Sequence, residues 1–317
     1  MPMSLEQYAE YLDTIDLVWP SPPDAQPPKA KPHLVRMPQV RAVTWSIYGT
    51  LLNIFNGQLL FEHPNKFVMD IALDKTVQEF KMWASMSRKP GQPSDYMGDI
   101  YRKVVADMRL APSRNEKHPE ILAERVWEAI VKKLQQKDYK FDASRYGALG
   151  DYARKIAYFF HASLQGTACY EGAGQALEHV HHAKLKQGLI ADTQCFTLVQ
   201  LQRGLTKQSC PETVDVLFDR SARALSHEVG GRTPSERLFK HCLTQLSAQG
   251  IAPAQVLHVG SRLSLDLEPA KKLGMKIALF AGDKGSLQAT GEQLKDPATR
   301  PDALLTELSQ IDQIVGT

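Results

Sequence analysis

The chain has 317 residues, 43% of them apolar, and a formal net charge of +3. It can bury a full core and hold two domains, and its mild charge argues against binding to nucleic acid or a membrane surface. The four cysteines are scattered, with no CxxC spacing and no secretory leader before them. With no apolar run near the ~18 residues of a membrane span, we expect a soluble, cytoplasmic protein with buried thiols.

The N-terminal stretch, residues 1–38, predicts a short helix followed by a proline-rich linker. Residues 4–16 place apolar side chains on one helical face, and Ser4 with Gln7 fits a capping box. We expect that face to pack on the main body or on another copy of the chain. Residues 20–32 are rich in proline, which indicates a semi-rigid extended linker rather than a folded element.

Residues 41–52 predict a buried strand that ends in a tight turn at Gly49-Thr50. From 54 to 165 the apolar residues, Trp83 among them, recur at helical spacing, with breaks at Pro90-Gly91 and Ala111-Pro112. This pattern predicts an all-helical subdomain inserted directly after the first strand.

From residue 166 onward, short apolar runs alternate with helical patterns. The runs near 187–191, 222–226, 255–259 and 276–280 read as strands, and a helix is expected from Pro234. Such alternation predicts a parallel, doubly wound sheet, in which ligands bind beyond the carboxyl ends of the strands. We therefore place the functional site just after Trp45, Ile190, Leu225 and Val259.

The segment Trp45-Ser-Ile-Tyr-Gly-Thr-Leu51 closely resembles motif I of the haloacid dehalogenase (HAD) superfamily of phosphatases and dehalogenases. There an apolar strand is followed by an Asp nucleophile, any residue, Asp or Tyr, and Gly-Thr-Leu. Ser46 stands at the nucleophile position. Tyr48 resembles the dehalogenase branch more than the phosphatase branch. The resemblance implies an α/β protein with a HAD-like doubly wound parallel sheet core and an inserted all-helical cap. The expected boundaries are 39–53 and 166–317 for the core, and 54–165 for the cap.

Three further segments resemble the other family motifs, and each lacks the expected functional group. Gly188–Gln194 resembles motif II, with Ala191 in place of Ser or Thr. Gly231–Phe239 resembles motif III, with Thr233 in place of Lys. His258–Asp266 resembles motif IV, where Ser261 replaces the first Asp and Asp266 alone matches an acidic position.

In the family, these groups supply a covalent nucleophile, donors and a cation for the transferring anion, and ligands for Mg²⁺. A hydroxyl such as that of Ser46 needs a neighbouring base, and one remaining carboxylate is too few for Mg²⁺. The resemblance therefore implies a HAD-like hydrolase fold that is catalytically degenerate, with a ligand-binding or interaction role. The alternative is an active phosphatase or 2-haloacid dehalogenase that uses Ser46 or an activated water.

We expect no cofactor, with Mg²⁺ required only under the hydrolase alternative. The expected partners are a small anionic ligand in the cap–core cleft and a second copy of the chain. The candidate catalytic positions are Ser46, Tyr48, Ala191, Thr233, Ser261 and Asp266, and the candidate ligand-binding residues are Thr50, Asp192, Thr193, Arg232 and Arg262.

Several of these residues have a plainer interpretation. Asp266 could activate Ser46, but that pair lacks a histidine relay, and His258 inside a strand is expected to be a core residue. Arg232 and Arg262 can attract an anion, or they can pair with local carboxylates. His179, His181 and His182 could bind a metal, but a solvated helix end is the simpler interpretation.

Overall fold

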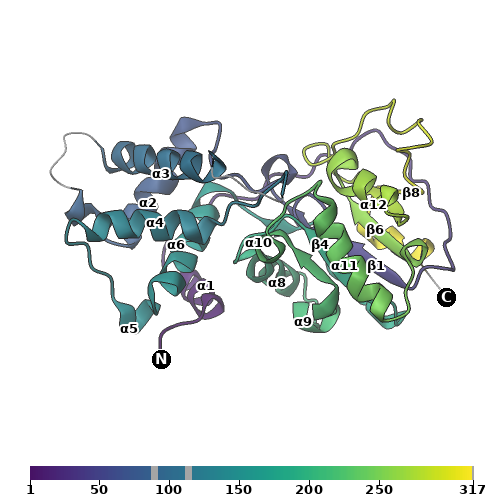
Figure 1. Cartoon of the computed structure of the whole chain (residues 1–317), viewed down its shortest axis with the longest axis horizontal. Helices are drawn as coiled ribbons and strands as arrows, with labels where there is room; N and C mark the ends of the chain where they lie inside the picture. The colour runs from purple at the N-terminus through teal and green to yellow at the C-terminus, as the bar shows by residue number, and fades with distance from the viewer. Residues whose placement is uncertain (87–91, 111–115, 316–317) are drawn as a thin grey trace.

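The computed structural model describes residues 1–86, 92–110 and 116–315. A group of helices and an α/β body lie side by side, joined by a narrow waist (Figure 1). The α/β body contains a six-stranded sheet in the order β5-β4-β1-β6-β7-β8, with all neighbours parallel. Its strands are β1 (Ala42–Trp45), β4 (Lys186–Ala191), β5 (Arg223–Leu225), β6 (Val256–Gly260), β7 (Lys276–Phe280) and β8 (Ala303–Leu305).

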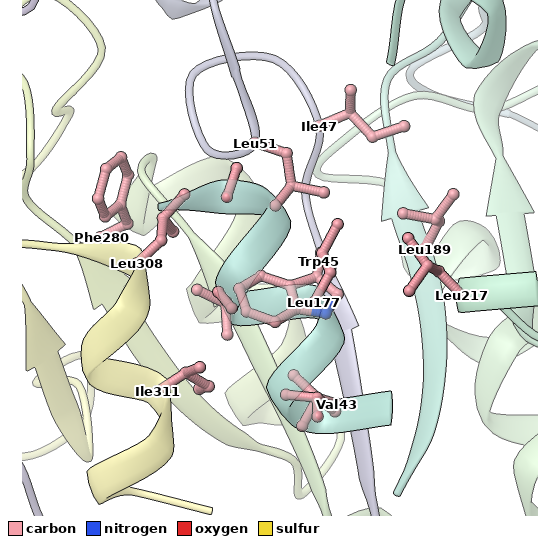
Figure 2. Packing of buried hydrophobic residues seen from close by; sticks show 14 of the residues in the cluster. Val43, Trp45, Ile47, Leu51, Leu177, Leu189, Leu217, Phe280, Leu308 and Ile311 are labelled. Carbon is pink, nitrogen blue, oxygen red and sulfur yellow. The ribbon is translucent and has the colours of Figure 1, made fainter. Parts of the chain in front are cut away.

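Helices cover both faces of this sheet, so its strands are apolar on both sides. Val43 and Trp45 of β1 face a cluster that includes Leu177, Leu308 and Ile311. Figure 2 shows these side chains packed together. One face carries α7 (Ala173–His182), α8 (Thr197–Lys207), α9 (Val214–Leu217) and η6 (Leu308–Gln313); the other carries α10 (Ser226–Val229), α11 (Glu236–Ala248), the π-turn η5 (Leu263–Leu267) and α12 (Glu268–Lys272). The predicted doubly wound α/β core is confirmed.

One local prediction about this body is wrong. The helix expected from Pro234 begins at Glu236, and Ser235 is its N-cap. Pro234 lies in the turn before Ser235 rather than in the first helical turn.

The inserted segment is an all-helical cap with its own aromatic core, as expected. Tyr101, Trp127 and Phe160 pack ring against ring, with centroids 4.9–5.5 Å apart. The cap contains α2 (Lys66–Glu79), α3 (Pro93–Leu110), α4 (Ala123–Gln135), α5 (Ala143–Tyr146) and α6 (Leu149–Leu164), with the short turns η1 (Phe55–Gly57) and η2 (Met82–Ser85).

Trp83 is not a core residue of the cap, contrary to its helical spacing. The helix α2 ends at Glu79, Lys81 has a positive φ, and Trp83 is 42% exposed in the following turn. The predicted breaks at Pro90-Gly91 and Ala111-Pro112 lie outside the described residues.

The helix α1 (Leu5–Asp13) begins with the expected capping box of Ser4 and Gln7. Its buried residues Tyr8 and Leu12 join the core of the cap. The chain crosses between cap and α/β body at β2 (Leu52–Asn53) and β3 (Ala168–Cys169), which pair antiparallel. Within the described residues, no helix is long and apolar enough to cross a membrane.

Candidate functional site

Ser46 directly follows β1 and therefore lies at the carboxyl edge of the sheet. The backbone amide of Ser46 donates to the Val259 carbonyl of β6 at 2.9 Å, which fixes its position beside motif IV. The turn that follows contains Gly49 at φ +77°, and a Cβ there would lie 2.9 Å from the Ser261 hydroxyl. Glycine therefore lets the first turn approach Ser261 closely.

A histidine lies beside Ser46, and this residue, His258, is fully buried in the core as expected. His258 Nε2 lies 3.4 Å from Ser46 Oγ, and His258 Nδ1 lies 3.0 Å from Thr44 Oγ1. Burial lowers the pKa of His258 to about 3, so the imidazole is neutral. The register that pairs Thr44 with His258 across β1 and β6 creates this contact. Ser46 Oγ can also donate to the Ile190 carbonyl at 3.4 Å.

Arg262 occupies the centre of the site and is 3% exposed. Its Nη2 donates to Asp266 Oδ1 at 2.6 Å, and its Nε donates to Asp266 Oδ2 at 3.2 Å. Its Nη1 donates to Asp192 Oδ2 at 3.2 Å, and its Nη2 also reaches Thr233 Oγ1 at 3.1 Å. One planar cation thus bridges two carboxylates, a geometry that suits guanidinium well.

Asp192 is held as an anion by donors from three directions. Its carboxylate accepts bonds from the Thr233 amide at 2.7 Å and the Thr233 hydroxyl at 2.8 Å. Burial alone would raise the pKa of Asp192, but Arg262, Arg232 and the Thr233 donors outweigh it and lower that pKa. Arg232 lies 3.7 Å from the carboxylate and its side chain is 42% exposed.

Residues 116–121 form a strap through which the cap covers this edge of the sheet. The sequence did not predict these contacts. The Arg232 amide donates to the His118 carbonyl at 2.8 Å, and Ser226 Oγ donates to Glu120 Oε2 at 2.6 Å. Burial, followed by the negative charge of Asp192, raises the pKa of Glu120 to about 7. Glu120 has no local signal in the sequence, because its partner Ser226 is more than a hundred residues away.

The remaining cavity beneath the strap is small, with a volume of about 30 Å³. A cavity of that size holds one or two water molecules. It is lined by Ser46, Ile47, Tyr48, Gln58, Leu59, Phe61, Glu120, Asp192, Thr193, Gln194, Arg232 and Arg262.

Several predicted residues lie at this edge but are engaged elsewhere. Tyr48 donates its hydroxyl to Gln200 Oε1 at 2.7 Å on α8. Thr193 contacts His227 Nδ1 through its hydroxyl at 2.8 Å. Ala191 ends β4 as a buried methyl group. The buried hydroxyls of Thr50 and Ser261 have no hydrogen-bond partner in the described part of the chain.

The residues at this edge do not fit Mg²⁺, which the fold family implies. The carboxylates of Asp192 and Asp266 already accept hydrogen bonds from Arg262, while Ser46 and Ser261 offer only neutral hydroxyls. Mg²⁺ favours carboxylate and water oxygens. Over the described ranges, no three His, Cys, Asp or Glu side chains, including the histidines near the end of α7, are grouped to hold a metal ion.

No family model and no curated protein matches the sequence. Among solved structures, a 2-haloacid dehalogenase from Pseudomonas syringae pv. Tomato DC3000 is similar, with 16% identity over 86% of this chain and 97% of that chain and a TM-score of 0.53. A HAD phosphatase from Thermococcus onnurineus is 15% identical over 86% of this chain and 97% of that one, with a TM-score of 0.48. The chain has a HAD hydrolase fold, as the motif resemblance implied. Such low identity does not establish an activity.

Proposed function

We propose that this HAD-fold protein has lost Asp-based hydrolysis and acts by binding rather than by turnover. The observation that carries the proposal is the Arg262 guanidinium, which is buried between Asp266 and Asp192. In the family resemblance, this edge of the sheet holds a nucleophilic carboxylate, a lysine and metal ligands. Here Arg262 pairs with Asp192 and Asp266 instead.

The electrostatics of the edge support this proposal. Two arginines face two aspartates, and Glu120 adds further negative charge when ionised. A transferring phosphoryl group carries negative charge and needs an excess of donors and cations aimed at it. The edge offers no such excess, and its cavity of about 30 Å³ has room for a small ion but not for an organic phosphate or a haloacid.

An anionic ligand in the cleft is a narrower form of the binding proposal. Its support is Arg232, which is half exposed. Its guanidinium lies 3.7 Å from the nearest oxygen of Asp192, which is longer than a direct hydrogen bond. Arg262, in contrast, has all its charge committed to buried carboxylates. An anion in this cleft would therefore depend on Arg232.

A second candidate function is a serine hydrolase built on Ser46 and His258. The favouring observation is the 3.4 Å separation of Ser46 Oγ and His258 Nε2. Burial lowers the pKa of His258 to about 3, which makes its imidazole a weak general base. The separation is longer than a strong hydrogen bond, and His258 is fully buried. We therefore rank this function second.

Turnover assays separate the two candidates. We would assay p-nitrophenyl phosphate and 2-chloropropionate, with and without Mg²⁺, for the wild type, Ser46→Ala and His258→Gln. We expect no turnover by any of the three proteins. Turnover that disappears in both variants would overturn the non-catalytic proposal and support the Ser46–His258 hydrolase. Turnover that survives in Ser46→Ala would point to a water-based route or a contaminant.

A further inference from the structure

The N-terminal arm, residues 1–37, contacts both bodies of the molecule. On the cap, the Met3 amide donates to the Arg145 carbonyl at 3.0 Å, and α1 packs below α6 (Figure 1). On the α/β body, His33 and Leu304 exchange two backbone hydrogen bonds of 2.9 Å, and the Met37 amide donates to the Ile314 carbonyl at 2.8 Å. The arm therefore spans from the cap to the far edge of the sheet.

The middle of the arm lies over the two crossings between cap and α/β body. Asn53, on the first crossing, donates its side-chain amide to the Pro23 carbonyl at 2.5 Å. Gly166, on the second crossing, approaches the arm so closely that a Cβ there would lie 2.3 Å from the Pro20 oxygen. Both crossings thus pack directly against the proline-rich segment.

A half-open pocket of about 180 Å³, the hinge cavity, lies where the arm, α6 and α8 meet. It is several times larger than the cavity of about 30 Å³ beside Ser46. A cavity of about 150 Å³ in another protein binds benzene, so this volume suits a molecule with one ring. Its walls are formed by Leu12, Asp13, Trp19, Pro20, Pro22, Tyr158, Ala162, Gln165, Gly166, Thr167, Gln200, Arg203, Gly204 and Lys207.

Two buried polar side chains in these walls each carry a donor group that makes no hydrogen bond to the described residues. Gln200 is 6% exposed, and its Oε1 accepts the Tyr48 hydroxyl, while its Nε2 has no hydrogen-bond partner among the described residues. Tyr158 is 5% exposed, and its hydroxyl likewise bonds to nothing in the described part of the chain. Neither atom is among the fully buried unpaired atoms of the described residues, so both are accessible from the pocket and free to donate to an acceptor bound there.

The charge of the cavity favours an anion. Arg203 is paired with Asp13 at 2.6 Å and also donates to the Ala9 carbonyl at 3.1 Å. Lys207 is exposed at the cavity and has no ion-pair partner within 1–86, 92–110 and 116–315. Arg203 and Lys207 against Asp13 leave one net positive charge.

Part of the lining is apolar. The Trp19 ring is held edge-on against Phe159, with ring centroids 5.4 Å apart. Pro20, Pro22 and Ala162 continue this surface. Such a wall suits a flat apolar body, since rigid rings make extensive contact at low entropic cost.

We propose that this hinge cavity binds a small monocarboxylate with a planar apolar body, of the size of benzoate. The carboxylate accepts from Gln200 Nε2, the Tyr158 hydroxyl and Lys207, and the ring lies against Trp19 and the prolines. This site extends the proposed binding role to a named ligand class. Its test is independent of turnover in the cleft, so the two proposals can fail separately.

Isothermal titration of the full chain tests the proposal, with benzoate and 4-hydroxybenzoate as probes. We expect saturable binding of one molecule per chain. Lys207→Gln should weaken it roughly five- to tenfold, because a charge-assisted bond is lost. Ala162→Leu should abolish it by filling the cavity. The matched control is Arg232→Ala, which alters the cleft and should leave benzoate binding unchanged.

Three results would overturn the proposal. The first is the absence of saturable binding for both probes at millimolar concentration in a folded protein. The second is equal affinity for benzamide, which has no charge. The third is binding that disappears in Arg232→Ala but persists in Ala162→Leu, since the ligand would then occupy the cleft. Thermal unfolding of each variant establishes that the loss of binding is not a loss of folding.

Discussion

Arg262 Nη2 lies 2.6 Å from Asp266 Oδ1, four residues along the chain, and both side chains are buried. Asp266 is the one acidic position at which the four motifs still match the HAD pattern. Its carboxylate accepts two hydrogen bonds from the Arg262 guanidinium, one on each oxygen. Because Arg262 follows Ser261 directly, the positive charge belongs to the polypeptide itself at the place where the family implies a metal.

Removing this arginine should strongly destabilise the fold. Arg262→Met leaves Asp266 and Asp192 buried without their cation, and breaking a buried pair in this way costs about 3–5 kcal/mol. Urea unfolding of the wild type and the variant measures the loss. Arg232→Met is the matched control, and we expect a change below about 1 kcal/mol because its side chain is 42% exposed. Equal small losses in both variants would contradict the structural role of Arg262.

Protonation of Glu120 should make the closed strap pH-dependent. The pKa of Glu120 is about 7 in the folded chain, above its ordinary value of 4.5. A raised carboxyl pKa means that the folded state binds the proton more tightly. Its contribution is fully present below about pH 4.5 and is lost as the pH rises through about 7. Since Glu120 is partly solvated, we expect a loss of about 1–2 kcal/mol.

The measurement is urea unfolding of the wild type and Glu120→Gln between pH 4 and pH 8. The glutamine variant cannot titrate at this position, so the difference between the two proteins should change across that window. Parallel pH profiles would show that Glu120 does not carry the effect.

Restoring the nucleophilic carboxylate should not restore hydrolysis. Ser46→Asp places a new charge beside neutral His258 and leaves Arg262 committed to Asp192 and Asp266. We expect no turnover of p-nitrophenyl phosphate with Mg²⁺, and a stability loss of about 1–3 kcal/mol from the buried charge. Ser46→Asn controls for side-chain volume. Mg²⁺-dependent turnover by Ser46→Asp would show that the edge still accommodates the metal.

Among the glycines at the hinge, Gly166 should tolerate substitution least. A Cβ in Gly166→Ala meets backbone atoms of Pro20 and Ser21 at 2.3 Å, so the arm must shift. We expect a loss of about 1–3 kcal/mol and faster tryptic cleavage after the exposed Lys29. Gly150→Ala is the control, since its Cβ meets nothing within 4 Å and should add about 0.5–1 kcal/mol of helix stability. Unchanged cleavage in Gly166→Ala would show that the arm does not rest on this glycine.

The sequence predicted the features that depend on local patterns. The strand before Ser46, the capping box of Ser4 and Gln7, and the helical cap follow from apolar spacing and turn residues, and the structure contains all three. The replacement of expected groups at Ser46, Ala191, Thr233 and Ser261 is visible without any structure.

Contacts between distant segments could not be predicted in this way. Glu120 reaches Ser226 from the cap, and His258 reaches Ser46 only because β6 lies next to β1. Adjacency of the two strands, known from the fold, would have located His258. The prediction for Trp83 was wrong for a different reason. Periodicity does not show where a helix ends, and α2 ends before Trp83.

The arm has a kinetic consequence. Because the chain packs Pro20 against Gly166 and ties Asn53 to Pro23, neither crossing can bend while the arm is seated. The cap and the α/β body can therefore change their relative orientation only after the arm has detached locally. The rate of that motion cannot exceed the rate of detachment.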